Sequence, residues 1–281
     1  MFNKIDRTTY CLILFSIIAC NTSNNKTEET KTTAQDSTVV LQEEQVNYTV
    51  GDDNMQGYIA YNESEETKKP GVLVVHEWWG LDEYTKKRVR DLAALGYVAF
   101  AVDMYGNGQI ADNPDDALKL AVPNYQNPQL AKSKFDAALA KLKTFDAVDT
   151  SRIAAIGYCF GGSMVLNMAR MGDDLKAVVS FHGGLKGVPA NKELLKANIL
   201  VCHGAEDKNV PQEEVQQFKK ELDSIGVAYT FKEYPNATHA FTNPASTENG
   251  KKFNLPIAYN AAADAASWND MKAFFAENLN K

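Results

Sequence analysis

Basic residues are too few in this sequence to suggest a protein that binds nucleic acid. The 281 residues include 29 Lys and Arg against 36 Asp and Glu, giving a formal net charge of -7 and a sequence pI of about 5.2. A nucleic-acid surface needs a basic face that displaces counterions, so we expect no nucleic-acid partner. No internal repeat is visible either, and hydrophobic residues at 44% are ordinary for a globular protein with a core.

Apolar runs long enough to cross a membrane are also missing. The run Cys11–Ala19 (CLILFSIIA) follows Lys4 and Arg7, and its length suits a signal peptide better than a transmembrane helix. Because Ile17–Cys20 resembles the bacterial lipobox, we expect residues 1–19 to be a lipoprotein signal and Cys20 to carry the lipid. The alternative is a plain secretory signal in which Cys20 is incidental.

The next segment has almost no apolar residues. Residues 20–40 are mainly Asn, Thr, Ser, Lys, Glu and Gln, which cannot bury enough surface to fold, so we expect a disordered tether. Residues 41–281 are expected to form one domain, held at the membrane only through the lipid. This predicts an extracytoplasmic bacterial lipoprotein, in the periplasm or on the cell surface; which membrane carries the anchor stays open.

Cysteine is scarce: of the four cysteines, Cys11 lies in the expected signal and Cys20 is the expected lipidation site. An extracytoplasmic protein could pair the other two, Cys159 and Cys202, in a disulfide. Cys202 lies in an apolar strand-like run, however, and is better explained as a small buried hydrophobic residue.

Short β-branched runs alternate with helical patterns, which is typical of an α/β protein whose mostly parallel sheet carries helices on both faces. Strands are expected at 45–50, 55–61, 72–75, 97–102, 153–156, 177–181, 199–202 and 229–234. Helices are expected at 83–95, 130–145, after Gly157 through Met171, and at 211–225 and 262–279. Residues 104–129 are rich in Gly, Asn, Asp and Pro and are expected to form a long loop that could hold one short helix.

The segment Gly157–Gly162 (GYCFGG) lies between an expected strand and an expected helix, the context of a G-x-nucleophile-x-G turn. Glycines allow the tight turn that pushes the Cys159 thiol above the sheet edge. The helix N-terminus favours the thiolate, and the Phe160 N–H is placed to bind an oxyanion. The alternative is a Gly-rich turn with a buried structural cysteine.

An acid and then a histidine should follow the nucleophile in the chain. Asp207 follows the strand ending at Cys202, and His239 follows the strand ending at Tyr234, so both are expected at the carboxyl edge of the sheet. Glu206 is the alternative acid. The other histidines, at positions 76, 182 and 203, are better explained as structural or supporting residues.

Three motifs resemble the dienelactone hydrolase family over about residues 46–279: Val75–Leu81 (VHEWWGL), the Cys159 turn, and the loops Gly204–Asp207 (GAED) and Thr238–Phe241 (THAF). The resemblance implies an α/β-hydrolase fold. It also implies that Glu77 holds the resting thiol and helps to activate it, and that Trp78 supplies the second oxyanion N–H.

We therefore expect a hydrolase that cleaves carboxylic esters or lactones through a Cys159–His239–Asp207 triad and an acyl-enzyme intermediate. The substrate pocket is expected to be lined by Trp79, Tyr105 and Phe241. No metal and no cofactor are expected, and we expect a monomer acting on a small molecule.

Two arginines that hold the substrate carboxylate in dienelactone-cleaving members of the family are missing. Asp103–Tyr105 is followed by Gly106, and His239–Phe241 is followed by Thr242 and Asn243, which cannot imitate a guanidinium clamp. Dienelactone itself is therefore not the expected substrate. Two alternatives stay open: a thioesterase, and a catalytically silent surface lipoprotein that uses the hydrolase fold as a binding module.

Overall fold

The structure is a computed structural model that describes residues 40–63 and 67–279. The expected leader at 1–19, the expected lipidation site Cys20 and all of the expected tether except Val40 lie outside the described residues. In the part of the chain that the structure describes, no helix has both the length and the hydropathy needed to cross a membrane.

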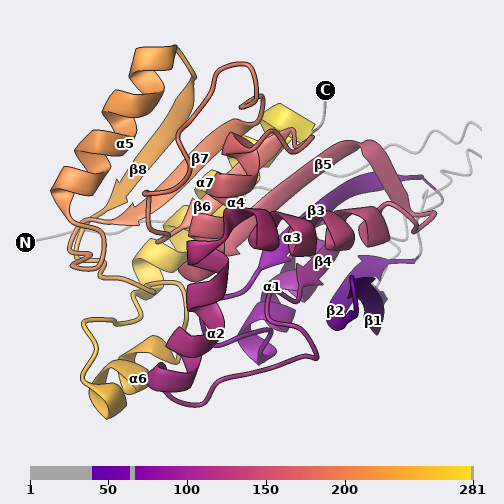
Figure 1. Ribbon diagram of the computed structural model, residues 1–281, viewed down its shortest axis with the longest axis horizontal. Coiled ribbons are helices and arrows are strands. Elements are labelled where there is room, and N and C mark those ends of the chain that lie inside the picture. Colours follow the sequence, from indigo (N-terminus) through magenta and orange to yellow (C-terminus); the bar gives the residue numbers. More distant parts are fainter. Residues whose placement is uncertain (1–39, 64–66, 280–281) are drawn as a thin grey trace, which may run out of the picture. The chain divides into compact units, whose positions relative to one another are not determined.

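Eight strands of the described residues form one sheet in the order β1-β2-β4-β3-β5-β6-β7-β8. The first two strands pair antiparallel with each other, β2 pairs antiparallel with β4, and β3 to β8 are parallel (Figure 1). Their bounds are β1 (Leu41–Val50), β2 (Asp53–Asn62), β3 (Lys69–Val75), β4 (Val98–Val102), β5 (Val148–Tyr158), β6 (Ala177–Phe181), β7 (Asn198–Gly204) and β8 (Tyr229–Tyr234).

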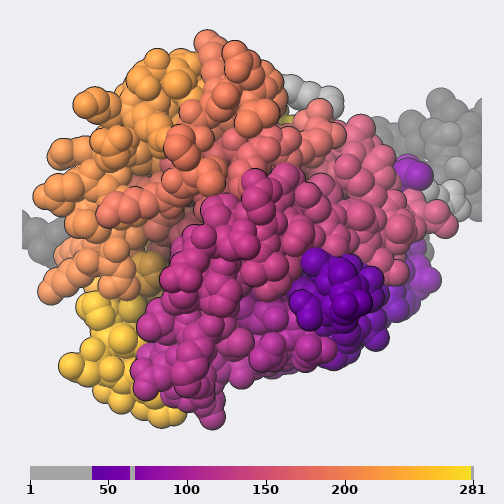
Figure 2. Space-filling model, viewed as in Figure 1, coloured from indigo at the N-terminus to yellow at the C-terminus, as the bar shows by residue number. Residues whose placement is uncertain are grey.

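Helices cover both faces of this sheet, which confirms the predicted α/β-hydrolase fold. Residues of α3, α4 and α5 belong to the hydrophobic cluster on one face, and residues of α1 and α7 belong to the cluster on the other. Their bounds are α1 (Glu83–Ala94), α2 (Pro114–Gln126), α3 (Pro128–Leu142), α4 (Phe160–Arg170), α5 (Gln212–Ile225), α6 (Ser246–Phe253) and α7 (Ala261–Leu279). In Figure 2, α2 and α3, in magenta, cover the middle of the visible face.

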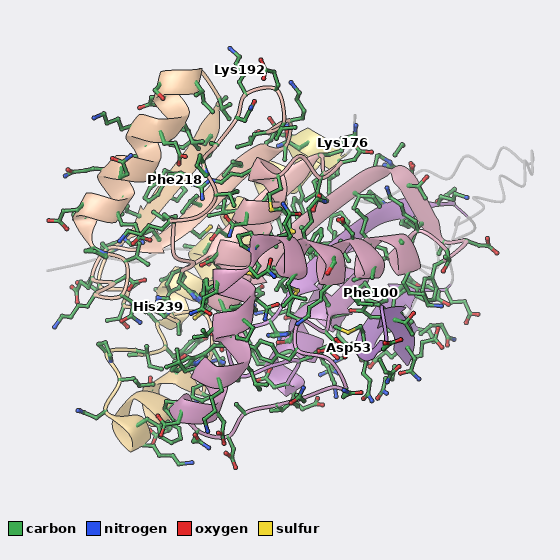
Figure 3. All side chains as sticks on the ribbon, in the orientation of Figure 1. Asp53, Phe100, Lys176, Lys192, Phe218 and His239 are labelled. Atoms are coloured by element: carbon green, nitrogen blue, oxygen red, sulfur yellow. The ribbon has the colours of Figure 1, made fainter. Side chains whose placement is uncertain are left out.

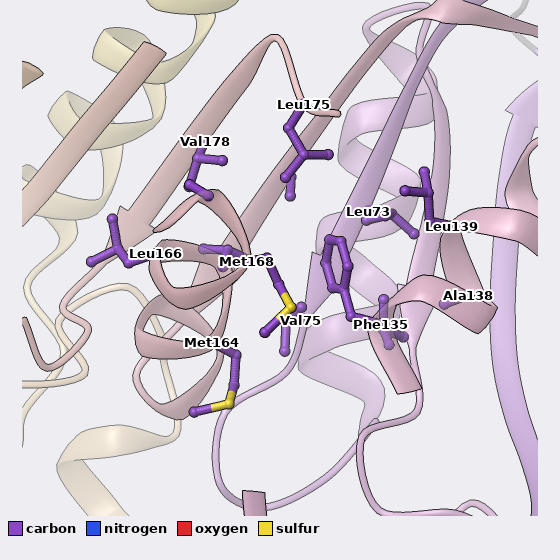
Figure 4. Close-up of a cluster of buried hydrophobic side chains, with 14 of the residues drawn as sticks. Leu73, Val75, Phe135, Ala138, Leu139, Met164, Leu166, Met168, Leu175 and Val178 are labelled. Atoms are coloured by element: carbon purple, nitrogen blue, oxygen red, sulfur yellow. The ribbon is translucent and has the colours of Figure 1, made fainter. Parts of the chain in front are cut away.

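The core under α3 and α4 fixes the central strands. Figure 4 shows Phe135 of α3 and Met164 and Met168 of α4 around Leu73 and Val75 of β3, and all five side chains are buried. Because a parallel sheet is covered on both faces, its strands are apolar throughout. This packing holds the carboxyl ends of β3 and β5 side by side, which is where the nucleophile turn emerges.

One segment differs from its sequence-based expectation. Residues 104–129 are not mainly a loop, because α2 is a 13-residue helix. Its start carries standard helix signals: the Asn113 side chain accepts a hydrogen bond from the Asp116 N–H, and Pro114 occupies the first turn. The Asn, Asp and Pro content that suggested a loop therefore marks a helix N-terminus. The short helix α6 had no expected counterpart.

Candidate active site

The nucleophile turn joins β5 to α4 at the carboxyl edge of the sheet. Cys159 has φ 52° and ψ -115°, a conformation unusual for a residue with a side chain. A Cβ at Gly157 would lie 2.1 Å from the Gly161 carbonyl oxygen, and one at Gly161 would lie 2.2 Å from that of Val75. Only glycine fits at both positions, and their close packing against neighbouring backbone holds the strained residue between them.

A backbone hydrogen bond joins the loop that carries Asp207 to the loop that carries His239. After β7, the N–H of Glu206 donates to the carbonyl of Ala237 at 2.9 Å, in the loop that follows β8. The close approach of these loops brings Asp207 and His239 together. Figure 3 labels His239, which lies between α5 and α6 in this view.

Cys159, His239 and Asp207 form a continuous hydrogen-bonded chain. The His239 Nε2 lies 3.0 Å from the Cys159 Sγ, and its Nδ1 lies 2.8 Å from the Asp207 Oδ2. The other carboxylate oxygen of Asp207 accepts the N–H groups of Asn209 and Val210 at 2.8 and 3.2 Å. Glu206, the alternative acid, is exposed.

The electrostatics of this chain favour a charged histidine. Burial alone would lower the pKa of His239, but the Cys159 thiolate and the Asp207 carboxylate outweigh it and raise the pKa well above its usual value. An imidazolium paired with a thiolate is the form in which a cysteine is most nucleophilic.

A cavity of about 240 Å³ opens beside the thiol. Its walls are mostly apolar, and it lies over the Cys159–His239 pair. The lining residues are Glu77, Trp78, Trp79, Cys159, Asn209, His239, Ala240, Leu255, Pro256 and Ile257. Within the described residues, no group of three or more His, Cys, Asp or Glu side chains could hold a metal ion.

Glu77 lines this cavity, but among the described residues it forms no hydrogen bond with the Cys159 thiol. Glu77 is 3% exposed, and its Oε2 accepts a hydrogen bond from the Asn243 Nδ2 at 2.6 Å. Burial raises the pKa of Glu77 to about 7. The thiol of Cys159 pairs with His239 instead, and among the described residues no hydrogen bond joins it to Glu77, which the family resemblance implied would hold it.

Two residues expected in the pocket lie behind its wall. Tyr105 is buried, and its hydroxyl donates to the carbonyl of Trp78 at 2.9 Å. Phe241 is fully buried against the ring of His182. Neither lines the cavity, because each side chain points into the packing beneath it; Trp79 alone of the three expected residues does.

The N–H groups of Phe160 and Trp78 are expected, from the sequence, to bind an oxyanion. Phe160 is the first residue of α4, so its N–H has no partner within the helix. The carbonyl of Glu77 is held by the His76 Nδ1 at 2.6 Å and by the N–H of Gly80 at 3.2 Å. Since a trans peptide points its N–H away from its carbonyl, these bonds also fix the direction of the Trp78 N–H.

A second buried histidine supports the turn itself. The His182 Nδ1 accepts the Cys159 N–H at 3.1 Å, so the other nitrogen carries the proton and faces the Thr242 hydroxyl at 2.8 Å. Burial lowers the pKa of His182 well below its usual value, which keeps the ring neutral. The sequence could mark His76 and His182 only as supporting residues, because the Met104 N–H beside His76 and the Thr242 hydroxyl beside His182 lie far along the chain.

The comparisons with known proteins agree on one family. The model of the dienelactone hydrolase family matches residues 55–279. Protein usf of Aquifex pyrophilus is 32% identical over 230 residues, 80% of this chain and 94% of that protein. The solved structure of a dienelactone hydrolase-like promiscuous phosphotriesterase from metagenomic libraries is 34% identical, with a TM-score of 0.79 over 85% of this chain and 98% of its own. A protein named m3DLH is also 34% identical, with a TM-score of 0.81 over 85% and 99% of the two chains.

Proposed function

This chain belongs to the dienelactone hydrolase family, and from that premise we propose that it cleaves carboxylic esters or lactones through Cys159, His239 and Asp207. The observation that supports the proposal most directly is the hydrogen-bonded chain from Asp207 through His239 to the Cys159 Sγ, at 2.8 and 3.0 Å. A protein that only binds a ligand would not need this series of hydrogen bonds to end at a thiol in a cavity.

In the proposed reaction, the Cys159 thiolate attacks the ester carbonyl carbon while His239 carries the proton. The negative charge that forms on the carbonyl oxygen is bound by the N–H groups of Phe160 and Trp78. Asp207 holds the Nδ1 proton of His239, which keeps the ring oriented and stabilises its charged form.

The intermediate then expels the alcohol, which takes the proton from the His239 Nε2, and an acyl group remains on the Cys159 sulfur. A water molecule next gives a proton to His239 and attacks the thioester carbon. The carboxylic acid leaves, and the proton on His239 restores the starting pair. Since a thiolate leaves more easily than an alkoxide, this nucleophile suits activated esters, enol lactones and thioesters better than amides.

The cavity does not favour dienelactone as the substrate. Among the residues that the structure describes, no Lys or Arg lines it, so a substrate carboxylate would meet no cation there. Asn243, which follows the histidine loop, already donates its amide to Glu77. A bound carboxylate would also lie in the same cavity as the Glu77 carboxyl group, and like charges there repel.

The test is hydrolysis of a short-chain p-nitrophenyl ester by the wild-type protein and by Cys159→Ala and His239→Ala, with folding checked by circular dichroism. Loss of turnover in both folded variants would support the triad. A thioester of the same acyl group, assayed in parallel, separates an esterase from a thioesterase. No turnover of esters, lactones or thioesters by the wild type would refute the proposal and favour the binding module.

From the sequence alone, we also propose that Cys20 carries a lipid and that the domain lies outside the cytoplasm as a monomer. Mass spectrometry of the membrane-bound protein should find the lipid on Cys20, and Cys20→Ser should release the protein from the membrane. An unmodified Cys20 would refute the anchor. Sedimentation of the released protein tests whether it is a monomer.

A further inference from the structure

Thr242 lies three residues after His239 and is fully buried. Its hydroxyl oxygen lies 2.8 Å from the Nε2 of His182, whose Nδ1 faces the Cys159 N–H at 3.1 Å. Thr242 thus connects the loop that carries His239 to the turn that holds the nucleophile. The hydrogen bonds among Cys159, His239 and Asp207 do not use this connection.

The direction of these bonds fixes the tautomer of His182. A backbone N–H can only donate, so the Nδ1 that faces Cys159 is the unprotonated, accepting nitrogen. The ring proton is then on Nε2, and the Thr242 hydroxyl oxygen accepts it. Burial lowers the pKa of His182 well below its usual value, so the ring does not gain a second proton that would turn Nδ1 into a donor. The Thr242 hydroxyl therefore selects the form of His182 that can bind the Cys159 backbone.

Helix α1 holds Thr242 from the other side. The Tyr84 hydroxyl lies 2.6 Å from the Thr242 hydroxyl, and the Arg88 Nη2 donates to the Thr242 carbonyl at 2.9 Å. The Arg88 Nε also donates to the Tyr84 hydroxyl oxygen at 3.3 Å, and Arg88 forms an ion pair with Asp264 of α7. Thr242 is thus fixed through both its side chain and its backbone, which a residue that only fills space would not require.

The two segments that Thr242 connects carry the two reacting groups. The Asn243 N–H donates to the Ala240 carbonyl at 3.2 Å, so Thr242 lies inside a tight turn that begins directly after His239. The ring of His182 also meets the ring of His239 edge-on, with centroids 5.4 Å apart. His182 itself has φ 42°, a strained conformation for a residue with a side chain. Such strain persists only where the surrounding contacts hold it, and it gathers at functional sites.

We propose that Thr242 is a positioning residue: through His182 it keeps the Cys159 turn and the His239 loop at the spacing that the thiolate–imidazolium pair requires. This inference rests on the proposed function and adds a residue that acts through others. Without the hydroxyl, the buried Nε2–H of His182 loses its acceptor, and a proton moved to Nδ1 would oppose the Cys159 N–H. That N–H also donates to the Phe181 carbonyl at 3.0 Å, so the turn should stay folded while the thiol shifts.

The variant that tests the hydroxyl is Thr242→Val, which keeps the shape of the side chain and removes the oxygen. Thr242→Ser does the reverse, since it removes a methyl group and keeps the hydroxyl. The matched control is Thr85→Val on α1. Thr85 is also fully buried, and its hydroxyl donates to the Asp82 carboxylate at 3.1 Å. All variants are made in the full chain, with folding checked by circular dichroism.

Two measurements report on the pair. The first is the ultraviolet absorbance of the Cys159 thiolate at neutral pH, taken as the difference between each protein and the same protein carrying Cys159→Ala. The second is kcat and KM for a p-nitrophenyl ester. We expect Thr242→Val to lose thiolate absorbance and to lower kcat by about tenfold or more, since an unsatisfied buried donor costs about that factor. KM should stay within about twofold of the wild type, and Thr242→Ser and Thr85→Val should keep both signals.

Unchanged thiolate absorbance in Thr242→Val would overturn the inference, whatever its kcat. A Thr242→Ser variant as impaired as Thr242→Val, or an equal loss in Thr85→Val, would also overturn it, because the hydroxyl would not be the cause. So would a wild type without thiolate absorbance, since there would be no pair to position. If Thr242→Val does not fold, Tyr84→Phe, which frees the Thr242 hydroxyl from α1, should lose part of the same absorbance, and no loss overturns the inference. If the wild type hydrolyses no ester, the proposed function fails, and the absorbance alone still decides the inference.

Discussion

Replacing Glu77 with Gln should change how the stability of the protein depends on pH. The folded protein raises the pKa of Glu77 from 4.5 to about 7 because the side chain is buried. The folded state therefore binds the proton more tightly than the unfolded state. The stabilisation from the protonated form is complete below about pH 4.5, and it is lost as the pH rises to 7. The rise of this pKa from 4.5 to about 7 corresponds to at most about 3.4 kcal/mol.

Between pH 5 and 8, this loss amounts to roughly 2.5 kcal/mol in the free energy of unfolding of the wild type. Gln has no proton to lose, so Glu77→Gln should gain about that much relative to the wild type over the same range. Urea denaturation at pH 5, 6, 7 and 8 measures the difference. Glu248→Gln, on exposed α6, should follow the wild-type profile. A difference between Glu77→Gln and the wild type that stays constant with pH would refute the reasoning.

Three further substitutions test the site. Gly157→Ala would place its Cβ 2.1 Å from a backbone carbonyl, so we expect a loss of about 3 kcal/mol or more in urea denaturation; a loss below about 1 kcal/mol would contradict the packing described. Asp207→Asn should lower kcat by about 10³–10⁴ with the fold intact, because His239 loses the acceptor that fixes its tautomer; an ester assay with near wild-type turnover would argue against the triad. Tyr105→Phe removes the hydrogen bond to the Trp78 carbonyl, so kcat should fall by about tenfold with KM little changed; a change in KM alone would place Tyr105 in substrate binding.

The central part of the site could be predicted because its residues are tied to strand ends. Cys159, Asp207 and His239 each follow a strand closely, and parallel strands bring their carboxyl ends to one edge of the sheet. Chain order then limits the choice of partners. The hydrogen bonds between the three residues match this expectation, whereas their role in catalysis stays a prediction.

The surroundings of the site could not be read from the sequence in the same way. Tyr105 lies near the motif, but whether its ring faces the cavity or the core depends on packing against His76 and Phe160. The cavity wall at Leu255 and Ile257 comes from an irregular segment with no periodic pattern. The hydrogen bond from His182 to Thr242 appears only when both residues are placed in three dimensions.

The origin of this part of the cavity wall affects how the domain can evolve. Leu255, Pro256 and Ile257 line the cavity from the connection between α6 and α7, outside the strands of the sheet. The nucleophile, by contrast, is locked between glycines that tolerate no added atom. Substitutions in this connection can therefore change the shape of the cavity while the positions of Cys159, His239 and Asp207 stay the same. Selection could alter which ligand the cavity accepts without rebuilding the turn that holds the proposed nucleophile.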